Sequence, residues 1–162
     1  MVLTLTSSAF ENNGVIPAKY TCDGSRELSP PLMISDAPEG TKSFVLIVDD
    51  PDIPEVVKKS HGLEAFDHWV LYNIPVPVGG EVEVPAGATP GSTGLNSAGG
   101  MKYISPCPPS QYEPKEHRYV FTLYALNEML HFPNAPTARQ VRDALTPFLL
   151  AKTKLIGRYS RP

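Results

Sequence analysis

Prolines occur throughout this sequence, and the short intervals between them limit what the chain can fold into. Eighteen prolines and twelve glycines are scattered between short apolar runs. Proline fixes φ and has no backbone N–H, so it interrupts long helices and central strands but suits turns and loops. The pattern therefore predicts a mostly β protein in which short strands are joined by braced loops.

Length and composition indicate one ordinary globular domain. A chain of 162 residues is long enough to bury a sizeable core. Its 41% hydrophobic and 19% charged residues are typical of globular proteins, and the sequence contains no internal repeat and no linker-like tract. We therefore predict a single domain that covers residues 1–162.

Charge and hydropathy argue against two kinds of partner. The formal net charge is −3, and Lys58-Lys59 is the only adjacent basic pair, so the basic face that nucleic acids require is missing. No apolar run approaches the roughly 18 residues of a membrane span.

No signal peptide is recognisable, so we expect a cytoplasmic protein. Cys22 and Cys107 could form a disulfide, but the reducing conditions of the cytoplasm favour free thiols.

Short apolar segments have the pattern of β-strands. The run Ser43–Val48 is continuously apolar, rich in β-branched residues and too short for a helix, so it predicts a buried central strand. Glu81–Val84 alternates cleanly and predicts an edge strand. Further strands are predicted at Leu3–Ser7, Leu32–Ile34, Asp67–Ile74, Arg118–Leu126 and Leu155–Tyr159.

Helical signals are confined to the C-terminal part. Thr137 is a suitable N-cap, and Val141, Ala144 and Leu145 follow on one helical face. Pro147 predicts a second, short helix that begins after Thr146. The segment from Glu55 to Glu64 is expected to be an exposed loop.

Polar side chains collect where three of the predicted strands begin or end. Asp50 and Asp52 follow the central strand in a proline-braced turn, and His68 stands at the start of the next strand. His117 and Tyr119 share one side of a third strand, because alternate residues of a strand face the same way. Two acids, two histidines and a tyrosine at neighbouring strand ends make a candidate site.

A proline-rich loop could provide a wall for this site. It is Ser105–Ser110, within the irregular and glycine-rich residues 86–116, a kind of long stretch that is often functional. Pro108 and Pro109 stiffen the loop, and a rigid wall loses little entropy when it binds a ligand. Tyr103, just upstream, could contribute a hydroxyl group.

These segments, in this order, resemble the phosphatidylethanolamine-binding proteins, also called Raf kinase inhibitor proteins, and specifically their bacterial branch. The resemblance extends over nearly the whole chain. It rests on Tyr20–Gly24, Ser29–Leu32, Asp50–Pro54, His68–Val70, Pro106–Pro109, His117–Phe121 and Leu155–Tyr159.

The resemblance implies an antiparallel β-sandwich with a few short helices near the C-terminus and a small anion-binding cavity. In the family this cavity accepts phosphate or phosphorylated head groups. Carried over by motif, the residues that line it are Asp50, Asp52, His68, Pro109, His117 and Tyr119, with Pro108 and Tyr103 as weaker candidates. No cofactor and no metal are expected.

A physical hypothesis reconciles two carboxylates with an anionic ligand. An adjacent carboxylate favours the charged form of histidine. If Asp50 or Asp52 bonds to His68, the imidazolium can donate its other N–H to a phosphate oxygen. Backbone N–H groups of Cys107, Ser110 and Gln111 could add donors. Binding would then weaken as pH rises above the histidine pKa values.

Two alternatives from other classes remain open. The Asp and His groups could serve an acid–base or metal-assisted hydrolase, although no G-x-S-x-G motif is present. Alternatively, the domain could regulate a protein partner such as a kinase or protease and read a phosphorylated segment in its pocket. The sequence names no such partner.

Overall fold

Two β-sheets of unequal size frame the molecule, for which a computed structural model describes residues 2–162. The small sheet has the antiparallel order β1-β3-β6, and the large sheet is antiparallel except for the pair β2–β9. The small sheet consists of β1 (Thr4–Thr6), β3 (Leu32–Ser35) and β6 (Val82–Val84). The large sheet consists, in spatial order, of β2 (Gly14–Val15), β9 (Leu149–Tyr159), β8 (His117–Leu126), β4 (Ser43–Asp50), β5 (Phe66–Pro75) and β7 (Ser92–Thr93).

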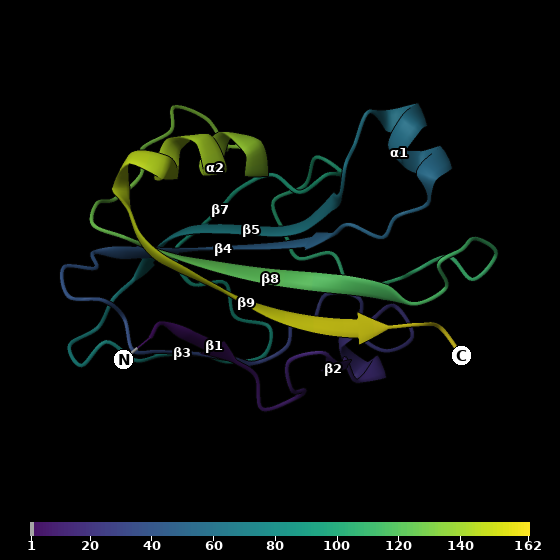
Figure 1. The fold of residues 1–162 in the computed structure, drawn as a ribbon, viewed down its shortest axis with the longest axis horizontal. Helices are drawn as coiled ribbons and strands as arrows, with labels where there is room; N and C mark the ends of the chain where they lie inside the picture. Colours follow the sequence, from purple (N-terminus) through teal and green to yellow (C-terminus); the bar gives the residue numbers. More distant parts are fainter. Residues whose placement is uncertain (1) are drawn as a thin grey trace.

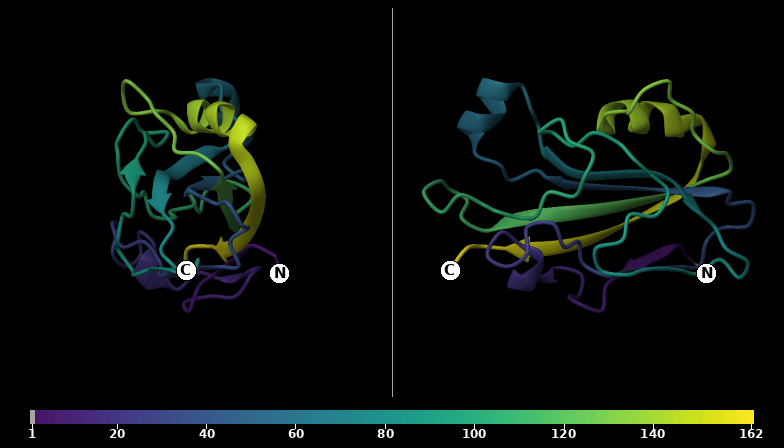
Figure 2. Two further views of the ribbon diagram at one scale, coloured as in Figure 1. Left: turned by 90° about the vertical axis from the view of Figure 1, so that its left-hand side faces the viewer. Right: turned by 180° about the vertical axis from the view of Figure 1, so that it is seen from behind.

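The large sheet is covered on both faces, which explains the unbroken apolar run of β4. Phe44, Leu46 and Val48 face the small sheet and belong to the main core between the two sheets. Val45 and Ile47 belong to a second core together with Val141 and Leu145 of helix α2. Helix α2 lies over this face of the large sheet (Figures 1 and 2). The predicted buried central strand and the antiparallel sandwich are thus confirmed.

Helix α2 (Ala138–Leu145) begins and ends where the sequence predicts. The Thr137 hydroxyl accepts a hydrogen bond from the Gln140 N–H, and the Gln140 side chain accepts one from the Thr137 N–H, which forms a capping box. Val141 and Leu145 are buried against the sheet. The predicted second helix is one 3₁₀ turn, Thr146–Phe148.

The expected loop after β4 is instead helix α1 (Glu55–His61), so that prediction was wrong. The helix starts after Pro54 and ends at Gly62, whose φ of 64° is left-handed. None of its residues is buried, so it carries no apolar stripe that sequence periodicity could detect. A 3₁₀ turn, Ala18–Tyr20, completes the helical elements. Within residues 2–162, no helix has the length and apolarity needed to cross a membrane.

Cys22 and Cys107 form a disulfide, which corrects the expectation of free thiols. Their Cα atoms lie 5.3 Å apart although 85 residues separate them in sequence. The Cys22 N–H also donates to the Pro106 carbonyl at 3.0 Å, so backbone and side chain hold the same two segments together. The expectation rested on compartment alone, and the sequence could not show that the fold brings these thiols into contact.

We expect the paired substitutions Cys22→Ser and Cys107→Ser to lower the free energy of unfolding by about 4 kcal/mol, because the disulfide closes a long loop in the unfolded chain. Chemical denaturation measures this change. The control is a reducing agent, which should destabilise the wild-type protein and leave the double variant unaffected. If the reducing agent did not lower the free energy of unfolding of the wild-type protein, the prediction would be contradicted.

Candidate functional site

A cavity of about 250 Å³ opens where the end of β4 meets the beginnings of β5 and β8. This is the end of the large sheet that carries α1, away from α2 (Figure 1). Its polar lining residues are the buried side chains Asp50, His68, His117 and Tyr119, together with Ser105. The cavity therefore joins side chains from three strands that are far apart in sequence.

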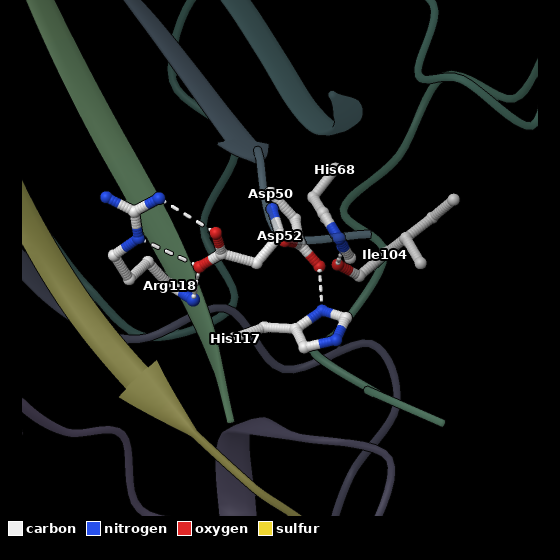
Figure 3. A network of polar contacts seen from close by, with 6 residues as sticks. All are labelled: Asp50, Asp52, His68, Ile104, His117 and Arg118. Atoms are coloured by element: carbon white, nitrogen blue, oxygen red, sulfur yellow. Dashed lines mark hydrogen bonds and ion pairs between the residues drawn. The ribbon is translucent and has the colours of Figure 1, made fainter. Parts of the chain in front are cut away.

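Asp50 and His117 form the central contact of the site. The His117 Nδ1–H donates to Asp50 Oδ2 at 2.6 Å, and the two residues are only 1% and 3% exposed (Figure 3). The other Asp50 oxygen accepts the Asp52 N–H at 2.8 Å. Burial opposes the charged imidazolium, but the hydrogen bond and the negative charge of Asp50 outweigh it, so the pKa of His117 is raised. His117 therefore stays cationic to a higher pH than an ordinary histidine.

Two buried polar atoms beside this contact have no hydrogen-bond partner within residues 2–162: His117 Nε2 and the Tyr119 hydroxyl. Both side chains line the cavity, and their rings stack with centroids 6.4 Å apart. Burial raises the pKa of Tyr119, so its hydroxyl keeps its proton and can donate. Leaving such a group unpaired costs about 1–3 kcal/mol. Both atoms are thus buried on side chains that line the cavity, and the Pro114 carbonyl near the His117 ring also favours its charged form.

His68 has a different partner from the one expected. Its Nδ1 lies 2.7 Å from the Ile104 carbonyl oxygen, and neither Asp50 nor Asp52 bonds to it (Figure 3). The hypothesis of a carboxylate bound to His68 was therefore wrong. The Asp50 carboxylate instead accepts a hydrogen bond from His117 on β8, the strand next to β4. His68 bonds to a backbone carbonyl of the irregular segment that follows β7.

Asp52 bonds to Arg118 and holds the turn after β4 against the start of β8. It accepts bonds of 2.8 Å from Nε and Nη2 of Arg118, and its Oδ2 also accepts the Arg118 backbone N–H at 2.8 Å. These hydrogen bonds lower the pKa of Asp52. Asp52 is thus placed to position the turn that carries Asp50, and it does not line the cavity.

Tyr103 also lies outside the cavity. Its buried hydroxyl donates to the Tyr20 carbonyl at 3.2 Å, and its ring packs edge-on against Trp69. Pro108 and Pro109 do line the cavity, as the sequence predicted for the proline-rich loop. Of the eight predicted residues, the fold gathers six around the cavity: Asp50, His68, Pro108, Pro109, His117 and Tyr119.

Sequence reasoning missed the apolar wall of the cavity. Ile53 and Pro54 follow the acidic turn, Val57 comes from α1, and Phe66 and Ile104 complete this wall. Proximity to the Asp-Pro-Asp turn could have suggested the first two, whereas no motif marks the others. In the described part of the chain, no group of three or more His, Cys, Asp or Glu side chains is arranged to hold a metal ion.

Comparisons with known proteins agree with this geometry. The family model for phosphatidylethanolamine-binding proteins matches residues 6–160. A UPF0098 protein of Methanothermobacter thermautotrophicus is 40% identical over 98% of this chain and 99% of its own length. A UPF0098 protein of Chlamydia trachomatis is also 40% identical, with the same coverage of both chains. The chain belongs to the phosphatidylethanolamine-binding protein family.

Solved structures give the same result. A phosphatidylethanolamine-binding protein homologue from Chlamydia trachomatis superimposes with a TM-score of 0.87 at 38% identity, over 99% of both chains. YbcL of E. coli gives a TM-score of 0.82 at 25% identity, over the full length of both chains. The fold predicted from the sequence is therefore that of the family.

Asp50→Asn should lower the pKa of His117, because burial still opposes the cation while the hydrogen bond to a charged carboxylate is lost and only the smaller contributions of the Pro114 carbonyl and Asp52 remain. NMR titration of the His117 ring measures this pKa. In the wild-type protein the raised pKa stabilises the fold at low pH, and this contribution is lost as pH rises through the folded-state pKa.

The control for this experiment is Asp52→Asn. Asp52 adds only a minor electrostatic contribution to the pKa of His117, so this variant should shift it much less. Equal shifts in the two variants would show that the direct bond to Asp50 is not what holds the charge.

Proposed function

We propose that this protein binds a small oxyanion, such as a phosphoryl group, in the cavity at the ends of β4, β5 and β8. The observation that carries the proposal is a pair of buried polar atoms without a hydrogen-bond partner among residues 2–162, His117 Nε2 and the Tyr119 hydroxyl, on side chains that line the cavity. Charge-assisted hydrogen bonds from a cationic histidine to an oxyanion are among the stronger ones in proteins. An oxyanion satisfies both donors at once.

The Asp50 carboxylate supports this function although it is negative. It bonds to Nδ1 of His117 and stabilises the imidazolium, which leaves Nε2–H as the ring donor that we propose binds the ligand. The net charge of the Asp50–His117 pair is zero. The imidazolium therefore offsets the repulsion that the carboxylate alone would exert on an anion. Asp50 in this role positions His117 and fixes its charge.

We propose binding without turnover. The disulfide removes Cys107, the thiol nearest the cavity, as a nucleophile. Incubation with phenyl phosphate, followed by phosphorus NMR, should leave the ester intact. Phosphate release that disappears in a Tyr119→Phe variant would instead favour the hydrolase alternative.

Inorganic phosphate titrated into the protein and followed by NMR or calorimetry tests the binding proposal. Tyr119→Phe should weaken phosphate binding about tenfold, since one hydrogen bond to a charged group is lost. Tyr103→Phe is the matched control: it removes another buried tyrosine hydroxyl that lies outside the cavity, and affinity should change less than about twofold. Equal effects of the two variants, or no saturable binding by the wild-type protein, would contradict the proposal.

Sulfate isolates the pH dependence of the protein, because its own charge is constant near neutrality. Its affinity should fall as pH rises through the folded-state pKa of His117, above the ordinary value of about 6.5, because the cation and its Nε2–H donor are lost together. NMR titrations at several pH values measure this fall. In Asp50→Asn the fall should begin at lower pH, and a wild-type affinity that stays constant from about pH 6 to 9 would count against the role of His117.

A further inference from the structure

The disulfide between Cys22 and Cys107 belongs to the wall of the cavity. Cys107 is exposed and lines the cavity, whereas Cys22 is half-buried. Thiol–disulfide exchange requires that a thiolate reaches one of the two sulfur atoms. Of the two cysteines, Cys107 is therefore the one that a dissolved thiolate can approach in the folded protein.

The turn that carries Cys22 is held by contacts of its own. Thr21 is fully buried, and its N–H and its hydroxyl both donate to the Ala18 carbonyl, at 3.0 and 2.8 Å. On the other side of Cys22, the Asp23 carboxylate accepts the Tyr159 hydroxyl at 2.6 Å. These bonds do not involve the disulfide, so the turn has reason to stay in place without it.

The proline-rich loop, Ser105–Ser110, has few such contacts. Its residues Pro106, Pro108 and Pro109 have no N–H to donate. Within residues 2–162, the only backbone hydrogen bond that joins this loop to a segment distant in sequence is the one from the Cys22 N–H to the Pro106 carbonyl. Apart from the packing of the buried Pro106 and Pro108, the loop is thus attached by two bonds that both go to Cys22.

We propose that this disulfide is a redox switch of the cavity wall. A dithiol in solution reduces it in the folded protein, and the proline-rich loop then moves away from the turn that carries Cys22, which opens this side of the cavity. The residues that the loop contributes to the cavity lining are Ser105, Cys107, Pro108 and Pro109. The inference goes beyond the proposed oxyanion binding and does not depend on what the cavity binds.

The reduction takes place in two exchange steps. A thiolate of the dithiol attacks Sγ of Cys107, and the S–S bond breaks with its electron pair on Sγ of Cys22. The second thiolate of the dithiol then attacks the dithiol sulfur of this mixed disulfide and releases Cys107 as a thiolate. The dithiol becomes a cyclic disulfide, the protein gains two electrons, and its two thiolates take up the two protons that the dithiol has lost.

The kinetics of reduction by dithiothreitol test whether the folded protein reacts. Free thiols are alkylated at successive times and counted by mass spectrometry. The rate should rise in proportion to the dithiothreitol concentration and change less than about twofold at denaturant concentrations below the unfolding transition. A rate that does not depend on dithiothreitol, or that rises with denaturant in step with global unfolding, would overturn the proposal.

Hydrogen exchange at position 22 measures the release of the loop, because this N–H donates to the Pro106 carbonyl. In the reduced protein it should exchange at least about tenfold faster, since its hydrogen bond is lost. The amides of Thr21 and Gly24 are controls within the same turn. They bond to the carbonyls of Ala18 and Thr21, so their exchange should change less than about twofold.

The paired substitutions Cys22→Ser and Cys107→Ser reproduce the reduced state without a reductant. The amide at position 22 should again exchange at least about tenfold faster, and dithiothreitol should add no further change. Nitrogen relaxation should show the order parameters of position 107 and Ser110 falling from about 0.85 in the oxidised protein to below about 0.6.

One pattern of results distinguishes a switch from a disulfide that only stabilises the domain. Equal acceleration of exchange at positions 21, 22 and 24 would show that reduction loosens the whole turn or the whole domain, and would overturn the proposal. Loss of the native NMR spectrum on reduction would overturn it as well. Acceleration confined to position 22, with a mobile loop, supports it.

Discussion

The hydrogen bond between Asp50 and His117 is the constraint on which the site depends. It joins the last residue of β4 to the first residue of β8, so it closes the ends of two neighbouring strands at the cavity. A buried carboxylate and a buried imidazolium are each costly alone, and together they neutralise one another. Outside the cavity, the Asp52–Arg118 contact holds the same turn against the same strand. Two contacts therefore hold the start of β8, which carries His117 and Tyr119, to the end of β4 and the turn after it.

The two histidines acquire different chemistry from their different partners. A carboxylate faces Nδ1 of His117, and a carbonyl faces Nδ1 of His68. Both contacts place a proton on Nδ1, but only the carboxylate carries a charge that retains a second proton on the ring. The pKa of His117 is raised and that of His68 is lowered by burial, so two histidines that line one cavity differ in their preference for the charged form.

Much of the fold could be predicted because local signals and tertiary structure agree. The apolar run of β4 is buried on both faces, and Thr137 caps α2 as its sequence context indicates. The polar residues around the cavity could be predicted because they stand at the ends of predicted strands. Helix α1 was missed because it buries no side chain, and the disulfide was missed because sequence gives no distance between Cys22 and Cys107. Which histidine Asp50 bonds depends on the positions of neighbouring strands, and a motif does not encode these.

Helix α1 has a consequence for how such a protein can diversify. It lies between β4 and β5, buries none of its own residues, and still contributes Val57 to the cavity wall. Substitutions along it can reshape the cavity wall at Val57 at little thermodynamic cost, since no core contact is lost. The part of the cavity wall that α1 contributes can therefore vary while the buried histidines stay in place.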